Sequence, residues 1–229
     1  MSKKPLKRGD KKALEEKMAR KQRSTASLSP LPPRSIIFCE GTKTEPHYLH
    51  EIVTLINDKY KDYARKNRIE LKDNIDVVGT GRSTRSLFEY ALQNVTTDTA
   101  EVWLVYDHDD FPSEQFNETP VMAEAQSKRG SINFNVAWSN ECFELWLLLH
   151  FIKLEANISR KEYIKKLKTY IPGYHKSASD IFNQLKDKTD LAITNAKEIE
   201  RVYEKGTTPS KMAPCTLVYK LVEDLLSYL

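Results

Sequence analysis

The chain has few cysteines and no long hydrophobic run. Among its 229 residues there are three cysteines with no repeated spacing, which argues against a disulfide framework and a structural zinc site. The longest apolar stretch, residues 143–152, is interrupted by Glu144 and is shorter than the roughly 18 residues that a membrane span requires. The basic start is followed by no apolar segment, so no secretory signal is expected. The sequence therefore predicts a cytoplasmic protein with no membrane association.

Several common catalytic signatures are also absent. The chain has neither a Gly-x-Ser-x-Gly elbow nor the helix motif of zinc proteases. The loop at residues 79–84, GTGRST, lacks the lysine of a P-loop and the glycine spacing of a dinucleotide-binding turn. These absences argue against a serine hydrolase of that type, a zinc protease and a P-loop nucleotidase.

Positive charge is concentrated at the start of the chain, although the formal net charge is only +4. Residues 1–29 hold ten Lys/Arg and three Asp/Glu, a charge of +7, which leaves −3 for the remaining 200 residues. We expect residues 1–33 to form a basic, flexible tail, because Pro30, Pro32 and Pro33 stop any helix there. Such a tail is suited to contact nucleic acid or a partner, and a solubilising extension is the alternative.

The rest of the chain divides into two regions by its hydrophobic pattern. Residues 34–152 alternate strand and helix patterns, which predicts an α/β core with a mostly parallel sheet flanked by helices. Residues 153–229 have helical patterns only, which predicts a helical C-terminal region packed on the core. The strands are expected at 36–40, 75–78, 101–106 and 132–138, and the helices at 45–65, around 87–91, and at 121–127, 141–151, 163–170, 179–185, 191–203 and 216–229.

Acidic residues follow two of the predicted strands. Glu40 comes directly after the apolar run 35–39, and Asp107 and Asp109 follow the strand expected at 101–106. Because the carboxyl ends of parallel strands meet at one edge of a sheet, we expect these three carboxylates to converge. Oxygen ligands of this kind suit Mg²⁺ or Mn²⁺. The alternative is a solvated acidic turn that happens to follow a strand.

A further acidic segment follows the fourth expected strand. Ser139 or Asn140 is expected to cap the helix at 141–151, which would turn the start of that helix toward the same sheet edge. Glu141 and Glu144 lie in its first turn and are further candidates for metal binding. Ordinary capping, with acids placed for the helix dipole, is the alternative for both.

Basic residues near these acids are candidates for holding a phosphate. Lys43 follows the first acid closely and is also a catalytic candidate. Arg82 and Arg85 lie in or next to the glycine-containing loop, where backbone amides and a helix N-terminus can assist. Lys176, in the helical region, is a candidate from its charge alone. A plain turn is the alternative for the loop.

Three segments together resemble the RloB-like family, whose core is of the Toprim type found in topoisomerases, primases and OLD-type nucleases. The segments read IIFCEGTKTEPHY at 36–48, VYDHDDF at 105–111 and SNECFELWLLLHF at 139–151. A fainter likeness continues through residues 213–225, where Ala213 and Cys215 differ from the family's Asn-Pro-Ser-Thr-like turn. The family is linked to bacterial restriction loci and to abortive defence against phage.

The resemblance implies a magnesium-dependent Toprim site. Carried over by position, Glu40 would be the general acid/base near the scissile phosphate, and Asp107 and Asp109 would hold the metal. Family members often lie beside an ATPase of the ABC/SMC-like type, so the resemblance implies such a partner. Further acidic positions, where a second metal would suit the nuclease branch, match Glu45, Glu141 and Glu144.

These observations favour a Mg²⁺-dependent nuclease that hydrolyses phosphodiesters of DNA or RNA in anti-phage defence. A non-catalytic adaptor that binds nucleic acid or an ATPase through the basic tail and helical end is the alternative. A primase-like nucleotidyl transferase on the same core is a third hypothesis, although no zinc or helicase module accompanies it.

Overall fold

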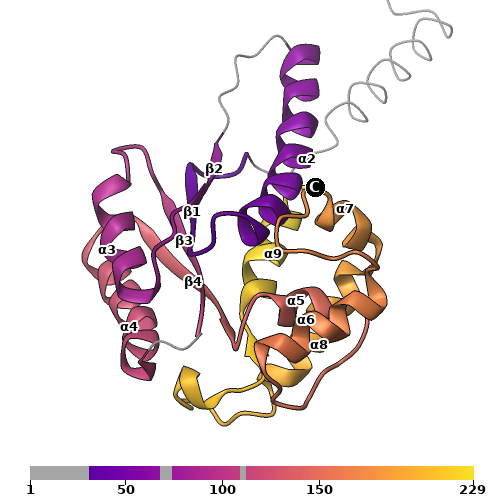
Figure 1. The fold of residues 1–229 in the computed structure, drawn as a ribbon. Helices are drawn as coiled ribbons and strands as arrows, with labels where there is room; N and C mark the ends of the chain where they lie inside the picture. Colours follow the sequence, from indigo (N-terminus) through magenta and orange to yellow (C-terminus); the bar gives the residue numbers. More distant parts are fainter. Residues whose placement is uncertain (1–30, 68–73, 109–111) are drawn as a thin grey trace, which may run out of the picture. The chain divides into compact units, whose positions relative to one another are not determined.

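A five-stranded sheet runs through the centre of the fold (Figure 1). The computed structural model describes residues 31–67, 74–108 and 112–229, so most of the predicted basic tail lies outside the described residues. The strand order is β2-β1-β3-β4-β5, with four parallel strands and an antiparallel fifth, which confirms the predicted α/β class with a mostly parallel sheet. The strands are β1 Ser35–Cys39, β2 Ile75–Gly79, β3 Glu101–Asp107, β4 Asn133–Asn140 and β5 Cys215–Thr216.

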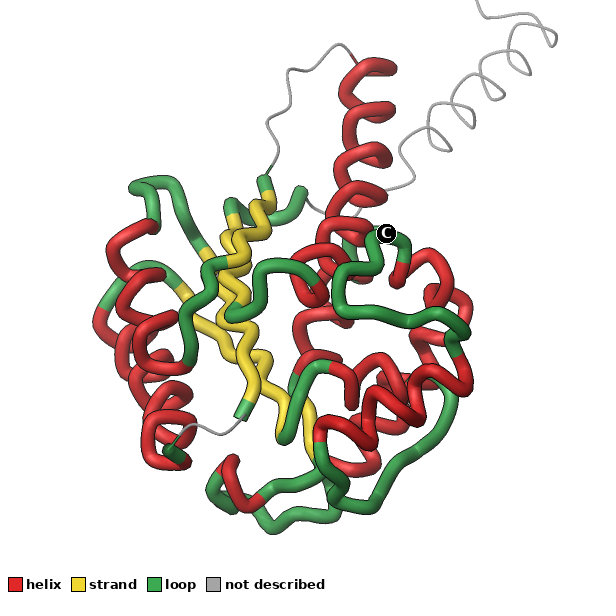
Figure 2. Tube along the Cα trace, viewed as in Figure 1, coloured by secondary structure: helices red, strands yellow, loops and turns green. Residues whose placement is uncertain are grey.

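Helices lie on both faces of this sheet (Figures 1 and 2). Two helices, α3 and α4, lie together on one face, and the others lie on the opposite side. None of the helices in the described ranges is both long and apolar enough to span a membrane. The helices are α2 Thr44–Asn67, α3 Thr84–Asn94, α4 Ser113–Arg129, α5 Glu144–Leu149, α6 Arg160–Tyr170, α7 Ile181–Leu185, α8 Thr189–Glu200 and α9 Val218–Leu226.

The connections that follow the two central strands leave the sheet on opposite faces. The chain passes from β1 through α2 to β2, whereas it passes from β3 through α4 to β4. The strands β1 and β3 are neighbours, with Cys39 opposite Val105. Adjacent parallel strands with diverging connections leave a crevice at their carboxyl ends, where open α/β sheets place their ligands. The residues that follow β1 and end β3 therefore lie at this crevice.

Several predicted elements differ from those in the structure. Ser139 and Asn140 do not cap a helix but end β4, because they pair with β5, a strand the sequence pattern did not predict. The helix expected at 141–151 is only α5, and all six of its residues are buried. The helix expected at 121–127 begins earlier, at Ser113, because buried side chains such as Phe116 extend its inner face through a mostly polar segment.

The outer edge of β4 is closed by side chains and by a short strand. The Ser127 hydroxyl of α4 accepts a hydrogen bond from the Phe134 N–H (2.7 Å) and lies 3.2 Å from the Phe134 carbonyl oxygen. Farther along, the Leu217 N–H donates to the Trp138 carbonyl oxygen (2.8 Å). These bonds occupy main-chain groups that would otherwise be open to pairing with another chain.

Gly79, the last residue of β2, permits the close approach of the turn after β1. A Cβ at this position would lie 2.9 Å from Gly41 O, from Thr42 Cα and from Pro46 Cγ. Two of these are backbone atoms of the turn and cannot swing aside. We expect Gly79→Ala to lower the free energy of unfolding by about 1–3 kcal/mol, measured by urea denaturation.

Gly130→Ala is the matched control for this substitution. A Cβ there would meet its nearest neighbour, Gln126 O, at 3.7 Å, which is an ordinary contact distance. We expect this variant to change stability by less than about 0.5 kcal/mol. Equal stabilities of the two variants would contradict the steric role given to Gly79.

Candidate functional site at the carboxyl edge of the sheet

Glu40 and Asp107 meet where the two central strands end. The Glu40 N–H continues the β1–β3 ladder by donating to Val105 O (2.8 Å). The Asp107 N–H in turn donates to Glu40 Oε2 (3.2 Å). Asp107 is buried and Glu40 is half-buried, and both residues line one pocket at the predicted edge. Asp109, the third predicted member, lies outside the described residues.

These two acids line a pocket of about 400 Å³. Its walls come from the turn after β1, the end of β3, the start of α5, the start of α6 and the loop before α7. Four carboxylates and three cationic side chains face one small volume, so charge dominates its chemistry. The lining residues are Glu40, Gly41, Thr42, Lys43, Thr44, Glu45, Gly81, Asp107, Phe143, Glu144, Arg160 and Lys176.

Besides Asp107, the carboxylates of Glu45 and Glu144 are also buried. Glu45, in the first turn of α2, folds back so far that a Cβ on Gly41 would lie 2.1 Å from its Oε2. Burial raises the pKa of Glu45, and the nearby charge of Glu144 acts in the same direction. Its own backbone N–H and the charges of Lys176 and Arg160 oppose that rise in pKa. Glu144 is 3 % exposed and accepts a hydrogen bond from the Tyr174 hydroxyl (3.4 Å).

The helical region supplies two cations to this pocket. Arg160 Nη2, in the first turn of α6, donates to Asp107 Oδ2 at 2.9 Å. Lys176 Nζ lies 3.7 Å from Glu144 Oε1. Both ammonium and guanidinium groups can hold phosphate oxygens, the guanidinium in a fork geometry. No motif or spacing in the sequence indicates Arg160, which lies 53 positions from its partner along the chain.

The loop that carries Lys176 is fixed to the start of α2. The Thr44 hydroxyl donates to the Lys176 carbonyl oxygen (2.7 Å), and His47 Nδ1 lies 3.3 Å from Ala178 O. Farther on, the Asn183 N–H donates to Glu51 Oε2 (2.8 Å). These contacts position the lysine at the pocket although the loop has no regular secondary structure.

Three predicted site residues do not line the pocket. Arg82 lies over the ring of Tyr90, with its Cζ 4.6 Å from the ring centroid. Arg85 forms an ion pair with Glu89 (3.0 Å) along α3. Glu141 is half-buried, and its Oε2 has no hydrogen-bond partner among the described residues. Lys43, Glu45, Glu144 and Lys176 do line the pocket.

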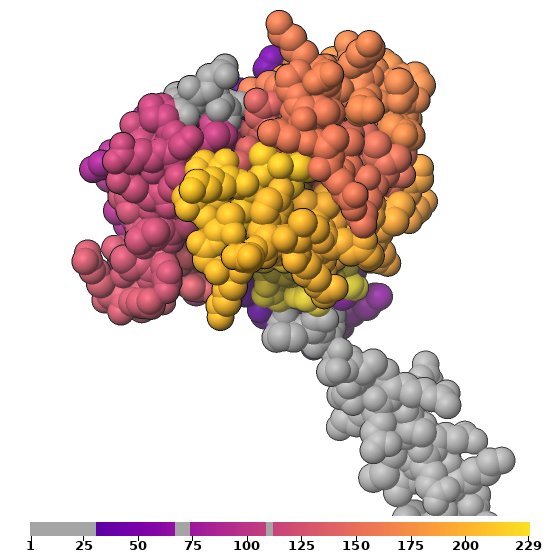
Figure 3. Space-filling view, turned by 90° about the horizontal axis from the view of Figure 1, so that it is seen from below, coloured from indigo at the N-terminus to yellow at the C-terminus, as the bar shows by residue number. Residues whose placement is uncertain are grey.

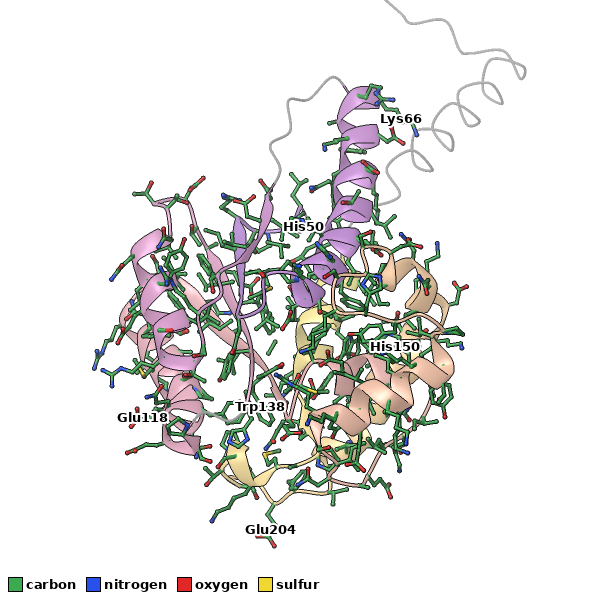
Figure 4. The ribbon with its side chains drawn as sticks, viewed as in Figure 1. His50, Lys66, Glu118, Trp138, His150 and Glu204 are labelled. Atoms are coloured by element: carbon green, nitrogen blue, oxygen red, sulfur yellow. The ribbon has the colours of Figure 1, made fainter. Side chains whose placement is uncertain are left out.

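A larger hollow, of about 560 Å³, lies between α4, α8 and α9. Trp138 and Glu204, both labelled in Figure 4, line it. In the view from below, the segment after α8 (yellow) forms the surface beside the magenta and pink helices (Figure 3). Two of its charged lining residues pair with residues outside it: Lys197 with Glu223 (2.5 Å) and Glu200 with Lys220 (2.8 Å). It holds two carboxylates, Glu200 and Glu204, against four in the pocket at the sheet edge, so it is less suited to hold a divalent cation.

The chemistry of the donor set fits a magnesium ion held by few protein ligands. No group of three or more His, Cys, Asp or Glu side chains within the described ranges is arranged to hold a metal. Mg²⁺, however, is commonly bound by one or two carboxylates, substrate phosphates and waters rather than by a full protein cage. Glu40 and Asp107 provide such a pair, since both line the pocket and the Asp107 backbone N–H donates to the Glu40 carboxylate.

The fold and site define an α/β protein with a carboxylate pocket at the topological switch point of its sheet. A family model described as RloB-like protein matches residues 35–225, and the chain therefore belongs to the RloB-like family. This confirms the family resemblance found in the three sequence segments. Searches of curated proteins and of solved structures found no match to the chain.

Proposed function

We propose that this chain is a Mg²⁺-dependent nuclease that hydrolyses phosphodiester bonds of DNA or RNA. The observation that carries the proposal is the meeting of Glu40 and Asp107 at the crevice between β1 and β3, within a pocket that also holds Arg160 and Lys176. Carboxylates suit a divalent cation and the two basic groups suit a phosphate. A Toprim-type core, which the family resemblance implies, supports the same reading.

The residues of the pocket would have different roles in the proposed hydrolysis. Glu40 and Asp107 would hold the cation, which when bound supplies Lewis-acid stabilisation of charge on the phosphate. Glu40 is also suited to exchange a proton with the attacking water, as the general acid/base of the site. Lys43, exposed on the turn after β1, and Lys176, from the helical region, would hold phosphate oxygens and orient the scissile bond.

The biological setting is part of the same proposal and rests on family membership. The resemblance links the RloB-like family to bacterial restriction loci and abortive defence against phage, so we propose an anti-phage role. A partner ATPase of the ABC/SMC-like type would control when the nuclease acts. We propose that the protein acts in the cytoplasm and does not associate with a membrane.

Cleavage of labelled substrates tests the proposed function. We expect the purified chain, alone or with its partner, to cleave at least one of duplex DNA, single-stranded RNA and tRNA when Mg²⁺ or Mn²⁺ is present. Addition of EDTA should abolish cleavage, because carboxylates alone do not stabilise the developing charge. Cleavage that persists in EDTA, or no cleavage of any substrate with either metal and the partner, would contradict the proposal.

A further inference from the structure

The Asp107 carboxylate of the proposed site forms an ion pair with an arginine of the same chain. Arg160 Nη2 donates to Asp107 Oδ2 at 2.9 Å, and the Asp107 side chain is only 9 % exposed. Glu40 lies against the backbone of the same residue, so negative charge is concentrated there. Without a bound metal, the guanidinium offsets part of the repulsion between these two carboxylates.

The start of α6 is held firmly, which fixes where Arg160 emerges. Ser159 caps the helix: its backbone N–H donates to Glu162 Oε2 (3.0 Å), and its hydroxyl donates to the same oxygen (3.1 Å). Tyr163 and Leu167 are buried beneath the helix. The Arg160 side chain, by contrast, is 32 % exposed and extends into the pocket. The helix is thus anchored, and its guanidinium lies at the wall of the pocket, partly open to solvent.

Arg160 and a divalent cation would compete in part for the Asp107 carboxylate. A carboxylate oxygen that coordinates Mg²⁺ cannot keep an undiminished hydrogen bond to a guanidinium at the same position, because two cations would then crowd one oxygen. The displaced guanidinium would lie beside the metal, where a substrate phosphate also binds. Arginine holds phosphate with the same fork that holds carboxylate.

We propose that Arg160 is an exchangeable counter-ion of Asp107. It neutralises this carboxylate in the metal-free protein and transfers to a substrate phosphate when a divalent cation takes its place. The inference rests on the proposed function and adds to it a positioning residue from the helical C-terminal region. It also gives that region a role in substrate binding.

Titration of Mn²⁺ by isothermal calorimetry, without nucleic acid, tests the exchange. Arg160→Gln removes the competing cation, so we expect it to bind Mn²⁺ about fivefold or more tightly than the wild type. Arg160→Lys keeps the charge without the fork and is expected to give an intermediate affinity. Lys165→Gln, an exposed change on the same helix, should match the wild type and controls for lost net charge.

A second measurement, of nucleic-acid affinity, is expected to change in the opposite direction from the affinity for Mn²⁺. With Ca²⁺ present to prevent cleavage, Arg160→Gln should bind a labelled oligonucleotide several-fold more weakly than the wild type, by fluorescence anisotropy, because a phosphate contact is lost. Thermal unfolding of each variant shows whether the site remains folded. A merely structural role for Arg160 would weaken both metal and nucleic-acid binding.

The outcomes separate the exchange from the nuclease proposal. Equal or weaker Mn²⁺ binding by Arg160→Gln, with Mn²⁺ binding by the wild type that Asp107→Asn abolishes, would overturn the exchange and leave the proposed function standing. A wild type that binds no Mn²⁺, or whose binding survives Asp107→Asn, would overturn both.

Discussion

Replacement of Asp107 by asparagine is expected to lower the rate of Mg²⁺-dependent cleavage by about 100-fold or more. The side chain ends a buried strand and lies at the crevice with Glu40. Asparagine keeps its shape but removes the charge that would hold a divalent cation and that Arg160 neutralises. The measurement is the single-turnover cleavage rate at saturating substrate, on whichever nucleic acid the wild type cleaves.

Asp187→Asn is the control for this variant, because Asp187 is exposed in a short helical turn away from the pocket. It should cleave at the wild-type rate. Equal activity of wild type and Asp107→Asn would favour the adaptor alternative instead. That alternative predicts that deletion of residues 1–29, with their charge of +7, abolishes function while Asp107 is dispensable.

The second large effect concerns His150, which lies among the C-terminal helices (Figure 4). Its side chain is fully buried; Nδ1 lies 3.0 Å from Trp146 O, and Nε2 lies 3.4 Å from the Tyr48 hydroxyl. Since a carbonyl oxygen only accepts, Nδ1 carries the proton and Nε2 accepts from the tyrosine. Burial lowers the pKa of His150 to about 4. The charge of Lys188 lowers this pKa further, whereas hydrogen bonds to the backbone of Trp146 and Leu147 raise it.

This shift makes stability dependent on pH in a definite direction. Above the unfolded pKa of about 6.5, the histidine is neutral in both states and contributes no pH dependence. As the pH falls below 6.5, His150 becomes protonated in the unfolded chain but stays neutral in the folded chain. The free energy of unfolding therefore decreases until the pH reaches the pKa of His150 in the folded state, about 4. We expect His150 to account for about 3 kcal/mol of lost stability between pH 7 and pH 4.

Urea denaturation at both pH values, for wild type and His150→Asn, isolates this contribution. The variant should be less stable at pH 7, because it loses a well-packed ring, but should lose less stability on acidification. His175→Asn is the control, because His175 is exposed and should leave the pH dependence as in the wild type. An unchanged pH dependence in His150→Asn would show that another group causes the acid sensitivity.

Several features of this protein are readable from local sequence. The runs 35–39 and 101–106 carry β-branched and aromatic residues over the length of a strand, and each is followed directly by an acid. Parallel strands bring such ends to one edge, so the meeting of Glu40 and Asp107 follows from pattern and topology. Short elements are harder to predict from sequence. The strand β5 has only two residues and forms because β4 lies beside it.

Local sequence patterns are enough to predict the alternating strands and helices, and with them the edge at which the first acids lie. Which charges face those acids depends on the packing of whole elements. Arg160 and Lys176 come from a helix start and a loop with no motif, and Arg82 and Arg85 turn to Tyr90 and Glu89 instead. The physical reason is that periodicity records which side of a helix or strand is buried, whereas the pairing of distant charges depends on how whole elements pack.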